Sequence, residues 1–409
     1  MKRPEVSHLI IEKDHFLLAE GLKIMVQRLE SDQPFKLEIK TRDDMGRVWR
    51  MQECFQADKS GEKRVFSTNI DLFERLKRDT DTAPYPPFFF KSDSDEIPFE
   101  LILMTEEGIH EVKEVHMLFK RPNTKVESVN SDFVGRYFKT DHAKGALLVL
   151  GGSSGGLLWS EQIAAFISSL GYNTLALNYF DRQCNTLPDE LVCIELESVR
   201  KAYDWLRQRE GETKHIHLMG ISKGSELALL FASDTEVALS SVVAFVPTSH
   251  VYEGISFGNH KNKSSWTLWG KELPFIPYPP DRPFTLTMKP EELREVHDLA
   301  YEKANSETRE RARIKVENID CPVLLISGTM DNTWNSKHMA SSLLKKIKEN
   351  NAKTLSEHIN FDKMGHTFYL PNFPPIIDNV SVTVEDAATA NRESWEKIEN
   401  FLKSLYTEV

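Results

Sequence analysis

One short segment of this chain has the residue pattern of a serine nucleophile. Residues 220–224 read Gly-Ile-Ser-Lys-Gly, so Ser222 lies between two glycines. The run 215–219 before it predicts a strand, and the run 224–233 after it predicts a helix. A serine at a sharp turn between strand and helix presents its hydroxyl at the end of a sheet, and glycines leave room for that turn. The pattern predicts that Ser222 attacks a carbonyl carbon.

Two further residues could activate this serine. A serine hydroxyl is a weak nucleophile that needs a base, and an acid orients that base. In a sheet of this kind the acid ends a late strand and the histidine follows the last strand. Asp331 follows the apolar run 323–327, and His366 follows a strand predicted at 358–361. The order predicts a serine–aspartate–histidine triad. Asp362 is a rival acid, although it does not end the preceding strand.

Backbone amides should stabilise the oxygen that becomes negative during attack. One donor is expected to be the N–H of Lys223, directly after the serine. The other is expected from Ser153 or Ser154, in a Gly-Gly-Ser-Ser-Gly-Gly loop after an apolar strand. Glycines let a backbone approach a ligand closely, so Gly152 and Gly155 are predicted substrate contacts. A phosphate loop is disfavoured because neither GK[ST] nor GxGxxG spacing is present.

The segment 141–409 has the pattern of an α/β domain. Unbroken apolar strands are predicted at 146–150, 173–178, 216–219, 241–247 and 323–327, and helices at 161–170, 191–210 and 223–233. Apolar strands alternating with helices predict a parallel sheet covered on both faces. The alternation stops at 250–318, which is too long for a simple connection. We predict that 250–318 is an insertion lying over the sheet edge as a lid.

The segment 1–140 has a different pattern. Apolar residues alternate with polar ones, for example at Phe35, Leu37 and Ile39. This period of two indicates half-buried strands, and turn residues separate them. The segment therefore predicts an antiparallel, immunoglobulin-like β-sandwich.

Composition limits the classes of function. The 51 basic and 62 acidic residues give a net charge of −11, which disfavours nucleic acid or an anionic membrane as the main partner. The composition, 40% hydrophobic and 28% charged, is that of a soluble globular protein. The apolar run 9–11 near the N-terminus is too short for a signal peptide, and no segment is long enough to span a membrane. A cytoplasmic location is expected.

The cysteine pattern argues against a metal centre. The four cysteines form no CxxC pair and are accompanied by no histidine cluster; they are Cys54, Cys184, Cys193 and Cys321. Structural zinc and a disulfide framework are therefore poor interpretations. No metal or redox cofactor is expected.

Five segments resemble one family, that of the acyl-CoA thioesterases and bile acid-CoA:amino acid N-acyltransferases. The segments are residues 151–158, 171–179, 220–224, 331–336 and 365–371. The resemblance implies an α/β-hydrolase domain preceded by a β-sandwich domain. In the amino-acid-conjugating branch the nucleophile is cysteine, whereas here it is Ser222. A serine ester is less reactive toward amines than a thioester, so water is the expected acyl acceptor.

The resemblance predicts an acyl-CoA thioesterase that needs no cofactor. The acyl chain would lie in an apolar groove, which we place under Trp266, Trp269 and Phe275. Three lysines are candidates for the CoA phosphates, although a solvated face also explains them: Lys261, Lys263 and Lys337. Two alternatives keep the triad. One is an acyltransferase that uses an amine or alcohol, and the other is a general ester or peptide hydrolase.

Overall fold

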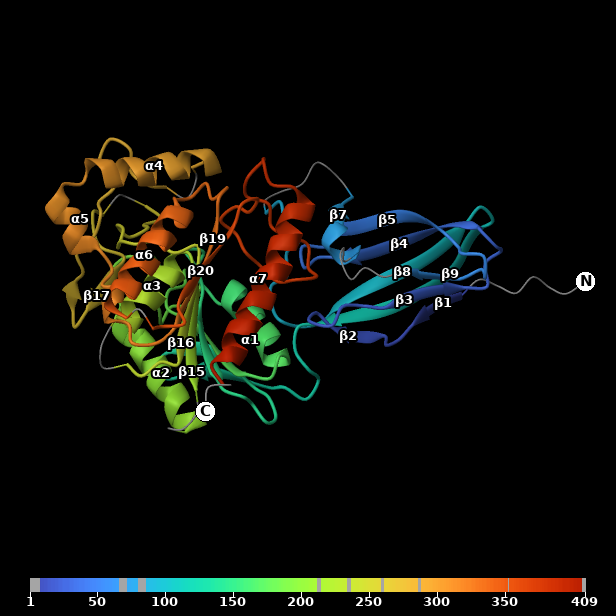
Figure 1. Cartoon of the computed structure of the whole chain (residues 1–409), viewed down its shortest axis with the longest axis horizontal. Coiled ribbons are helices and arrows are strands. Elements are labelled where there is room, and N and C mark those ends of the chain that lie inside the picture. The colour runs from blue at the N-terminus through green and yellow to red at the C-terminus, as the bar shows by residue number, and fades with distance from the viewer. Residues whose placement is uncertain are drawn as a thin grey trace, which may run out of the picture. The chain divides into compact units, whose positions relative to one another are not determined.

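The computed structural model describes residues 8–65, 72–79, 86–211, 215–233, 237–258, 261–285, 288–351 and 353–406 (Figure 1). The chain forms two compact units. The β unit comprises Met1–Pro122 and Tyr369–Ile376, and the α/β unit comprises Asn123–Phe368 and Ile377–Val409. Each unit has its own sheets, and each is described separately.

The α/β unit is built around an eight-stranded sheet in the order β10-β11-β13-β12-β15-β16-β19-β20. The strands are β10 Lys125–Asn130, β11 Val134–Lys139, β12 Ala146–Leu150, β13 Asn173–Asn178, β15 Ile216–Ile221, β16 Ser241–Phe245, β19 Val323–Gly328 and β20 Glu357–Phe361. From β13 to β20 all neighbours are parallel. The predicted strands of this segment are confirmed in position, and the α/β fold is confirmed. Parallel strands place their carboxyl ends along one edge, where β15, β19 and β20 each lead into a candidate catalytic loop.

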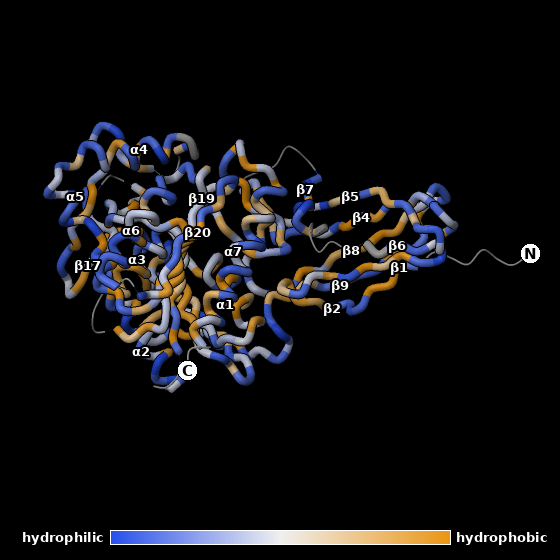
Figure 2. The backbone as a smooth tube through the Cα atoms, viewed as in Figure 1, coloured by the Kyte–Doolittle hydropathy of each residue, from blue (hydrophilic) through white to orange (hydrophobic). Residues whose placement is uncertain are grey.

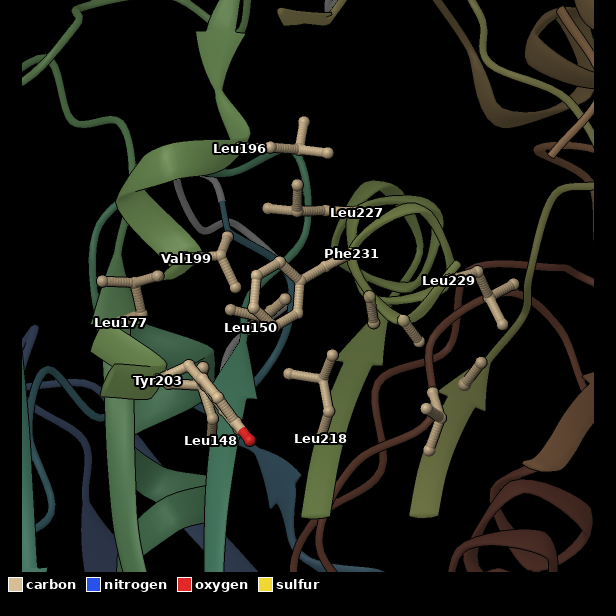
Figure 3. Close-up of a cluster of buried hydrophobic side chains, with 14 of the residues drawn as sticks. Leu148, Leu150, Leu177, Leu196, Val199, Tyr203, Leu218, Leu227, Leu229 and Phe231 are labelled. Atoms are coloured by element: carbon tan, nitrogen blue, oxygen red, sulfur yellow. The ribbon is translucent and has the colours of Figure 1, made fainter. Parts of the chain in front are cut away.

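Five helices cover the sheet: α1 Leu158–Ser169, α2 Leu196–Glu210, α3 Lys223–Ala232, α6 Ser336–Asn350 and α7 Val384–Ser404. Helices α2, α3 and α6 share a core with alternate strand residues such as Leu148, Leu150 and Val242. Figure 3 shows Phe231 of α3 between α2 and the strand leucines. Phe245, which has the opposite parity to Val242, contacts Trp395 of α7 at 6.1 Å between ring centroids. Helix α7 therefore covers the other face.

The domain boundary differs from the one predicted at residue 140. Strands β10 and β11 pair antiparallel with each other, and β11 pairs antiparallel with β13. They therefore extend the α/β sheet, and the β unit ends at Pro122. Strand β10 is largely exposed, and β11 mixes buried with half-buried residues, so the local pattern does not separate these two strands from those of the β unit.

The β unit contains a six-stranded and a three-stranded sheet, with the orders β2-β9-β8-β4-β5-β7 and β1-β3-β6. The strands are β1 His8–Ile11, β2 His15–Leu17, β3 Ile24–Gln27, β4 Pro34–Arg42, β5 Val48–Gln56, β6 Lys63–Val65, β7 Lys77–Arg78, β8 Ile97–Thr105 and β9 Gly108–Leu118, with a 3₁₀ turn at Leu72–Arg75. Each sheet buries one face, as Val26 and Leu101 illustrate. The pairs are antiparallel except β2 with β9, which is parallel.

A late segment of the chain also belongs to the β unit. Residues Tyr369–Ile376 return to it after the α/β strands are complete. The Asn372 N–H donates to Glu74 at 3.1 Å, and Phe373 packs against Phe89 with ring centroids 5.4 Å apart. The predicted division into two continuous segments is therefore incomplete.

The predicted insertion at 250–318 contains two short strands, β17 Trp266–Leu268 and β18 Lys271–Glu272, two helices, α4 Pro290–Lys303 and α5 Ser306–Ala312, and a 3₁₀ turn at Val316–Asn318. Strand β17 pairs with β14 Ile194–Glu195, just before α2. A second apolar cluster joins Tyr278 and Val296 of this segment to Trp334. Figure 2 shows the hydrophilic course of α4, in contrast with the hydrophobic centre of the unit. Whether this segment opens and closes as a lid stays a prediction.

Candidate active site

Ser222 lies at the tight turn between β15 and α3. Its φ of 55° and ψ of −123° are in a region that non-glycine residues rarely adopt. The flanking glycines make this turn possible, because a Cβ on Gly220 would collide with the Gly224 carbonyl. A Cβ on Gly224 would in turn collide with the Gly151 carbonyl. Local strain of this kind costs on the order of 1–3 kcal/mol and is maintained by the surrounding structure.

The structure brings the three predicted triad residues together. His366 Nε2 is 2.9 Å from Ser222 Oγ, and His366 Nδ1 is 3.0 Å from Asp331 Oδ1. Ser222 is 8% exposed and Asp331 is 3% exposed. Both ring nitrogens thus face the partners that proton transfer requires, at hydrogen-bonding distance.

Asp331 is held by the loop that follows β19. The backbone N–H groups of Thr333 and Trp334 donate to Asp331 Oδ1 at 2.9 and 3.2 Å. From the insertion, Arg294 donates to the Asp331 carbonyl oxygen at 3.0 Å. Asp362, the rival acid, is exposed and instead contacts Lys337 at 3.3 Å. The predicted preference for Asp331 over Asp362 agrees with this geometry.

Charge interactions within the triad separate the pKa values of its members. Burial alone would raise the pKa of Asp331, but the charge and hydrogen bond of His366 outweigh it and hold that pKa below its usual value. Burial alone would lower the pKa of His366, but Asp331 and the nearby Asp378 raise it above its usual value. Asp331 is therefore ionised at neutral pH, and it stabilises the protonated imidazole.

Two residues that were not predicted as site residues, Trp334 and Asp378, lie near the candidate triad. The Trp334 ring lies perpendicular to the His366 ring with centroids 4.8 Å apart, and its Nε1 donates to the Val246 carbonyl at 3.0 Å. Asp378 lies beside the histidine loop, where a Cβ on Gly365 would collide with its carboxylate. Burial raises the pKa of Asp378. Trp334 belongs to a motif already noted, whereas no local pattern marks Asp378.

The glycine-rich loop lies beside the nucleophile. A Cβ on Gly152 would be 3.4 Å from Ser222 Cβ. The Tyr179 hydroxyl donates to the Gly151 carbonyl at 2.5 Å, which anchors the start of the loop. Ser153 and Ser154 form the turn that follows. This placement is compatible with an amide donor from the loop, and the specific donor stays a prediction.

Lys223 and the predicted substrate contact Trp266 meet in a buried network rather than in a groove. Lys223 Nζ and Trp266 Nε1 each lie 2.7 Å from Glu226 Oε1, and Thr248 donates to Glu226 Oε2 at 3.1 Å. Trp266 is 0% exposed, so it does not line an open surface. No sequence motif marks Glu226 as a buried residue, because a charged residue on a helix is usually solvated.

Trp269, another predicted substrate contact, lies away from Ser222, whereas the predicted contact of Gly155 with substrate stays a prediction. Trp269 is 69% exposed and lines a cavity of about 470 Å³ with Leu230 and Phe231 at the far end of α3. Ten helical residues span about 15 Å, so this cavity lies roughly that far from Ser222 along the helix. Gly155 lies against Phe180, because a Cβ on Gly155 would collide with the Phe180 ring.

The three lysines considered for CoA phosphates each face a carboxylate. The pairs are Lys261 with Glu190, Lys263 with Glu272 at 3.3 Å, and Lys337 with Asp362 at 3.3 Å. Their side chains are about half exposed, so a solvated face explains these lysines.

Several known proteins are similar to this chain in sequence. The family model described as BAAT / acyl-CoA thioester hydrolase C terminal matches residues 194–407, just over half of the chain. Acyl-coenzyme A thioesterase 1 of Mus musculus is 24% identical over 411 residues, which cover 93% of this chain and 92% of the relative. Acyl-coenzyme A thioesterase 2, mitochondrial, of Mus musculus is 24% identical over 414 residues, covering 93% and 85%. Among solved structures, the α/β hydrolase MGS-M1 from a deep-sea metagenome library has a TM-score of 0.42 and 13% identity, covering 69% of this chain and 98% of that chain.

Proposed function

The chain belongs to the BAAT/acyl-CoA thioester hydrolase family, and on that premise we propose that it hydrolyses acyl-CoA thioesters with Ser222 as the nucleophile. The observation that carries the proposal is the position of His366, whose ring bridges Ser222 Oγ at 2.9 Å and Asp331 at 3.0 Å. Relatives named acyl-coenzyme A thioesterases align along 93% of the chain, which supports the substrate class.

The first half of the reaction transfers the acyl group to the enzyme. His366 Nε2 takes the proton of Ser222 as Oγ attacks the thioester carbonyl carbon. The carbonyl oxygen becomes an anion, which the N–H of Lys223 and an N–H of the glycine-rich loop stabilise. The carbon–sulfur bond then breaks, and the CoA sulfur leaves with the proton from His366. Ser222 is left as an acyl ester.

The second half returns the enzyme to its starting state. Water gives a proton to His366 while its oxygen attacks the ester carbonyl carbon. The bond to Ser222 Oγ breaks, Oγ recovers the proton from His366, and a fatty acid leaves, which loses its own proton to solvent at neutral pH. Asp331 remains ionised throughout and stabilises the imidazolium in both halves. These steps use side chains, backbone amides and water, so the proposal includes no metal or redox cofactor.

The experiment that tests the proposal is the release of free CoA thiol from acyl-CoAs of short to long chain. The native chain should turn over at least one chain-length class. Ser222→Ala should abolish turnover, whereas Ser233→Ala, a matched change at the other end of α3, should retain it. Equal activity of the native chain and Ser222→Ala would refute a serine mechanism.

The same assay separates the proposal from its two alternatives. Thiol release that requires added amino acids or alcohols would identify an acyltransferase. Cleavage of simple esters without cleavage of any thioester would identify a general hydrolase. Either result would replace the thioesterase assignment while leaving Ser222 as the nucleophile.

The cellular location stays a prediction. Among the helices of the described residues, none combines the length and apolarity needed to cross a bilayer. The relatives named acyl-coenzyme A thioesterase 2 carry the word mitochondrial in their names. The cytoplasmic location inferred from the sequence is therefore to be tested by fractionation.

A further inference from the structure

Two histidines and a glutamate meet at one edge of the six-stranded sheet of the β unit. His15 begins β2, His116 lies near the end of β9, and Glu96 immediately precedes β8. Strand β9 lies between β2 and β8, and His15 is the register partner of His116. The ligand atoms of the three side chains all lie within 4.8 Å of one another. Three neighbouring segments thus contribute one metal-ligating side chain each.

The ring nitrogens are divided between an inner and an outer set of carboxylates. On the inner side, His116 Nδ1 is 3.1 Å from Glu96 Oε1, and His15 Nε2 is 3.9 Å from Glu96 Oε2. On the outer side, His15 Nδ1 is 3.1 Å from Asp14, and His116 Nε2 is 3.1 Å from Glu114. Metal-binding histidines characteristically hold their second nitrogen on a carboxylate in this way, which fixes the ring and makes it a better ligand.

The inner nitrogen of His116, Nδ1, has no hydrogen-bond partner among the described residues. This nitrogen is buried at the level of the atom. Its 3.1 Å approach to Glu96 is a charge contact without hydrogen-bond geometry. A buried polar atom without a partner is uncommon and calls for an explanation. A cation between His116 and Glu96 would supply one.

We propose that His15, Glu96 and His116 bind a Zn²⁺ ion, with water completing a tetrahedral shell. Zinc–ligand bonds of 2.0–2.1 Å place ligand atoms about 3.4 Å apart in a tetrahedron. The inner distances of 3.1 and 3.9 Å are close to that value, and side chains that are 20–49% exposed can close the difference. Two imidazoles with one carboxylate suit zinc better than magnesium or calcium.

The ion would stabilise the edge of the β unit. Strand β2 is three residues long and pairs in parallel with β9. A zinc ion would join β2, β9 and the start of β8 through side chains, in addition to the few backbone hydrogen bonds of so short a strand. Because a metal that binds the folded state alone stabilises it, zinc should raise the unfolding temperature. This inference is independent of the catalytic proposal, since none of its residues belongs to the triad.

The test is equilibrium dialysis of the full chain against Zn²⁺, with metal content measured per chain. One zinc per native chain is expected. The ligand variants His15→Ala and Glu96→Gln should weaken binding more than a hundredfold. The outer variant Glu114→Gln should weaken it about tenfold, as loss of a supporting carboxylate typically does. His110→Ala, which removes another histidine from β9, should bind like the native chain.

Three results would overturn the proposal. These are the absence of binding at millimolar zinc, unchanged binding in Glu96→Gln, and equal weakening in His110→Ala. Glu96→Gln preserves the size of an exposed side chain, so loss of binding there is not explained by unfolding; circular dichroism checks this. Replacement of zinc by Co²⁺ gives a second readout: strong visible absorption supports a tetrahedral site, and its absence contradicts one. A zinc-dependent rise in unfolding temperature should occur in the native chain and be lost in His15→Ala.

Discussion

Replacement of Glu226 by glutamine should destabilise the α/β unit, and the loss should become smaller as the pH rises. Glu226 and Lys223 form an ion pair 2.7 Å long, with side chains that are 0% and 2% exposed. Glutamine has nearly the same size and keeps a carbonyl oxygen that can accept the bond from Trp266 Nε1. The substitution therefore removes mainly the negative charge, and it leaves the Lys223 ammonium buried without a counter-charge.

The expected loss at pH 7 is about 3–5 kcal/mol, the usual cost of removing one partner of a buried pair. The loss of unfolding free energy has an upper limit of about 5 kcal/mol. Lys223 can become neutral by releasing its proton, and at pH 7 this costs an ordinary lysine about that much. Burial already lowers the pKa of Lys223, and Glu226 opposes that effect, so loss of Glu226 lowers this pKa further. The folded variant then binds fewer protons than the unfolded chain. Above the lowered pKa of Lys223, the stability of the variant should therefore rise by up to about 1.4 kcal/mol per pH unit. The native chain gains this slope only above its own, higher Lys223 pKa, so the difference between the two chains becomes smaller in the pH range between these two values.

Urea unfolding at about pH 7 and pH 9, followed by circular dichroism, measures this effect. The double variant Lys223→Met with Glu226→Gln should be more stable at pH 7 than Glu226→Gln alone, because no unpaired charge remains. The control Glu310→Gln removes an exposed carboxylate from its pair with Arg313 and should cost less than about 1 kcal/mol. A loss below about 1 kcal/mol for Glu226→Gln, or an equal loss at both pH values without rescue by Lys223→Met, would refute the reasoning.

Three further predictions concern catalysis. Asp331→Asn should lower kcat by about 10⁴-fold, whereas Asp362→Asn should leave it nearly unchanged; the reverse order in steady-state kinetics would make Asp362 the acid. Asp331 outweighs the effect of burial and raises the pKa of His366. On acidification, kcat/KM should therefore fall with a midpoint above the ordinary histidine pKa of about 6.5. A pH–rate profile with a lower midpoint would contradict this. Gly152→Val should lower kcat/KM about 10²-fold, because a Cβ at this position would already lie 3.4 Å from Ser222 Cβ and valine adds two further carbons. Gly258→Val, where nothing lies within 4 Å of the added Cβ, should leave kcat/KM unchanged. Equal activities of the two variants would place the substrate away from Gly152.

The proximity of the three candidate triad residues could be predicted because each of them follows the end of a strand. A buried parallel strand is a strong local signal, since all six residues of β15 and of β19 are buried. Once those strands are located, the chain order of Ser222, Asp331 and His366 leaves few alternatives. The 2.9 and 3.0 Å contacts then follow from sheet order, which brings the loops after β15, β19 and β20 to one edge.

The sequence pattern misplaces short or mixed segments, whose position depends on contacts with residues distant in the sequence. Strand β10 has five of six residues exposed, and it joins the α/β sheet only through β11, which pairs in turn with β13 about 40 residues later. Trp266 lies in the insertion, yet it is fully buried in the apolar core, and its N–H donates to Glu226, forty residues earlier. Local patterns cannot reveal such pairings, because tertiary contacts decide burial in short or mixed segments.

The buried pair of Lys223 and Glu226 connects the chemistry of the site to the insertion. Lys223 is the residue whose N–H we assign to the negatively charged oxygen, so any shift of its backbone would misplace that donor. Its side chain is fixed one turn into α3 by Glu226, and Glu226 is itself held by Trp266 of the insertion. An exposed lysine at this position would leave the first turn of the helix less constrained. We infer that burial of this charge, costly for stability, positions the start of α3, and that the insertion contributes to catalysis through this contact even if it never moves as a lid.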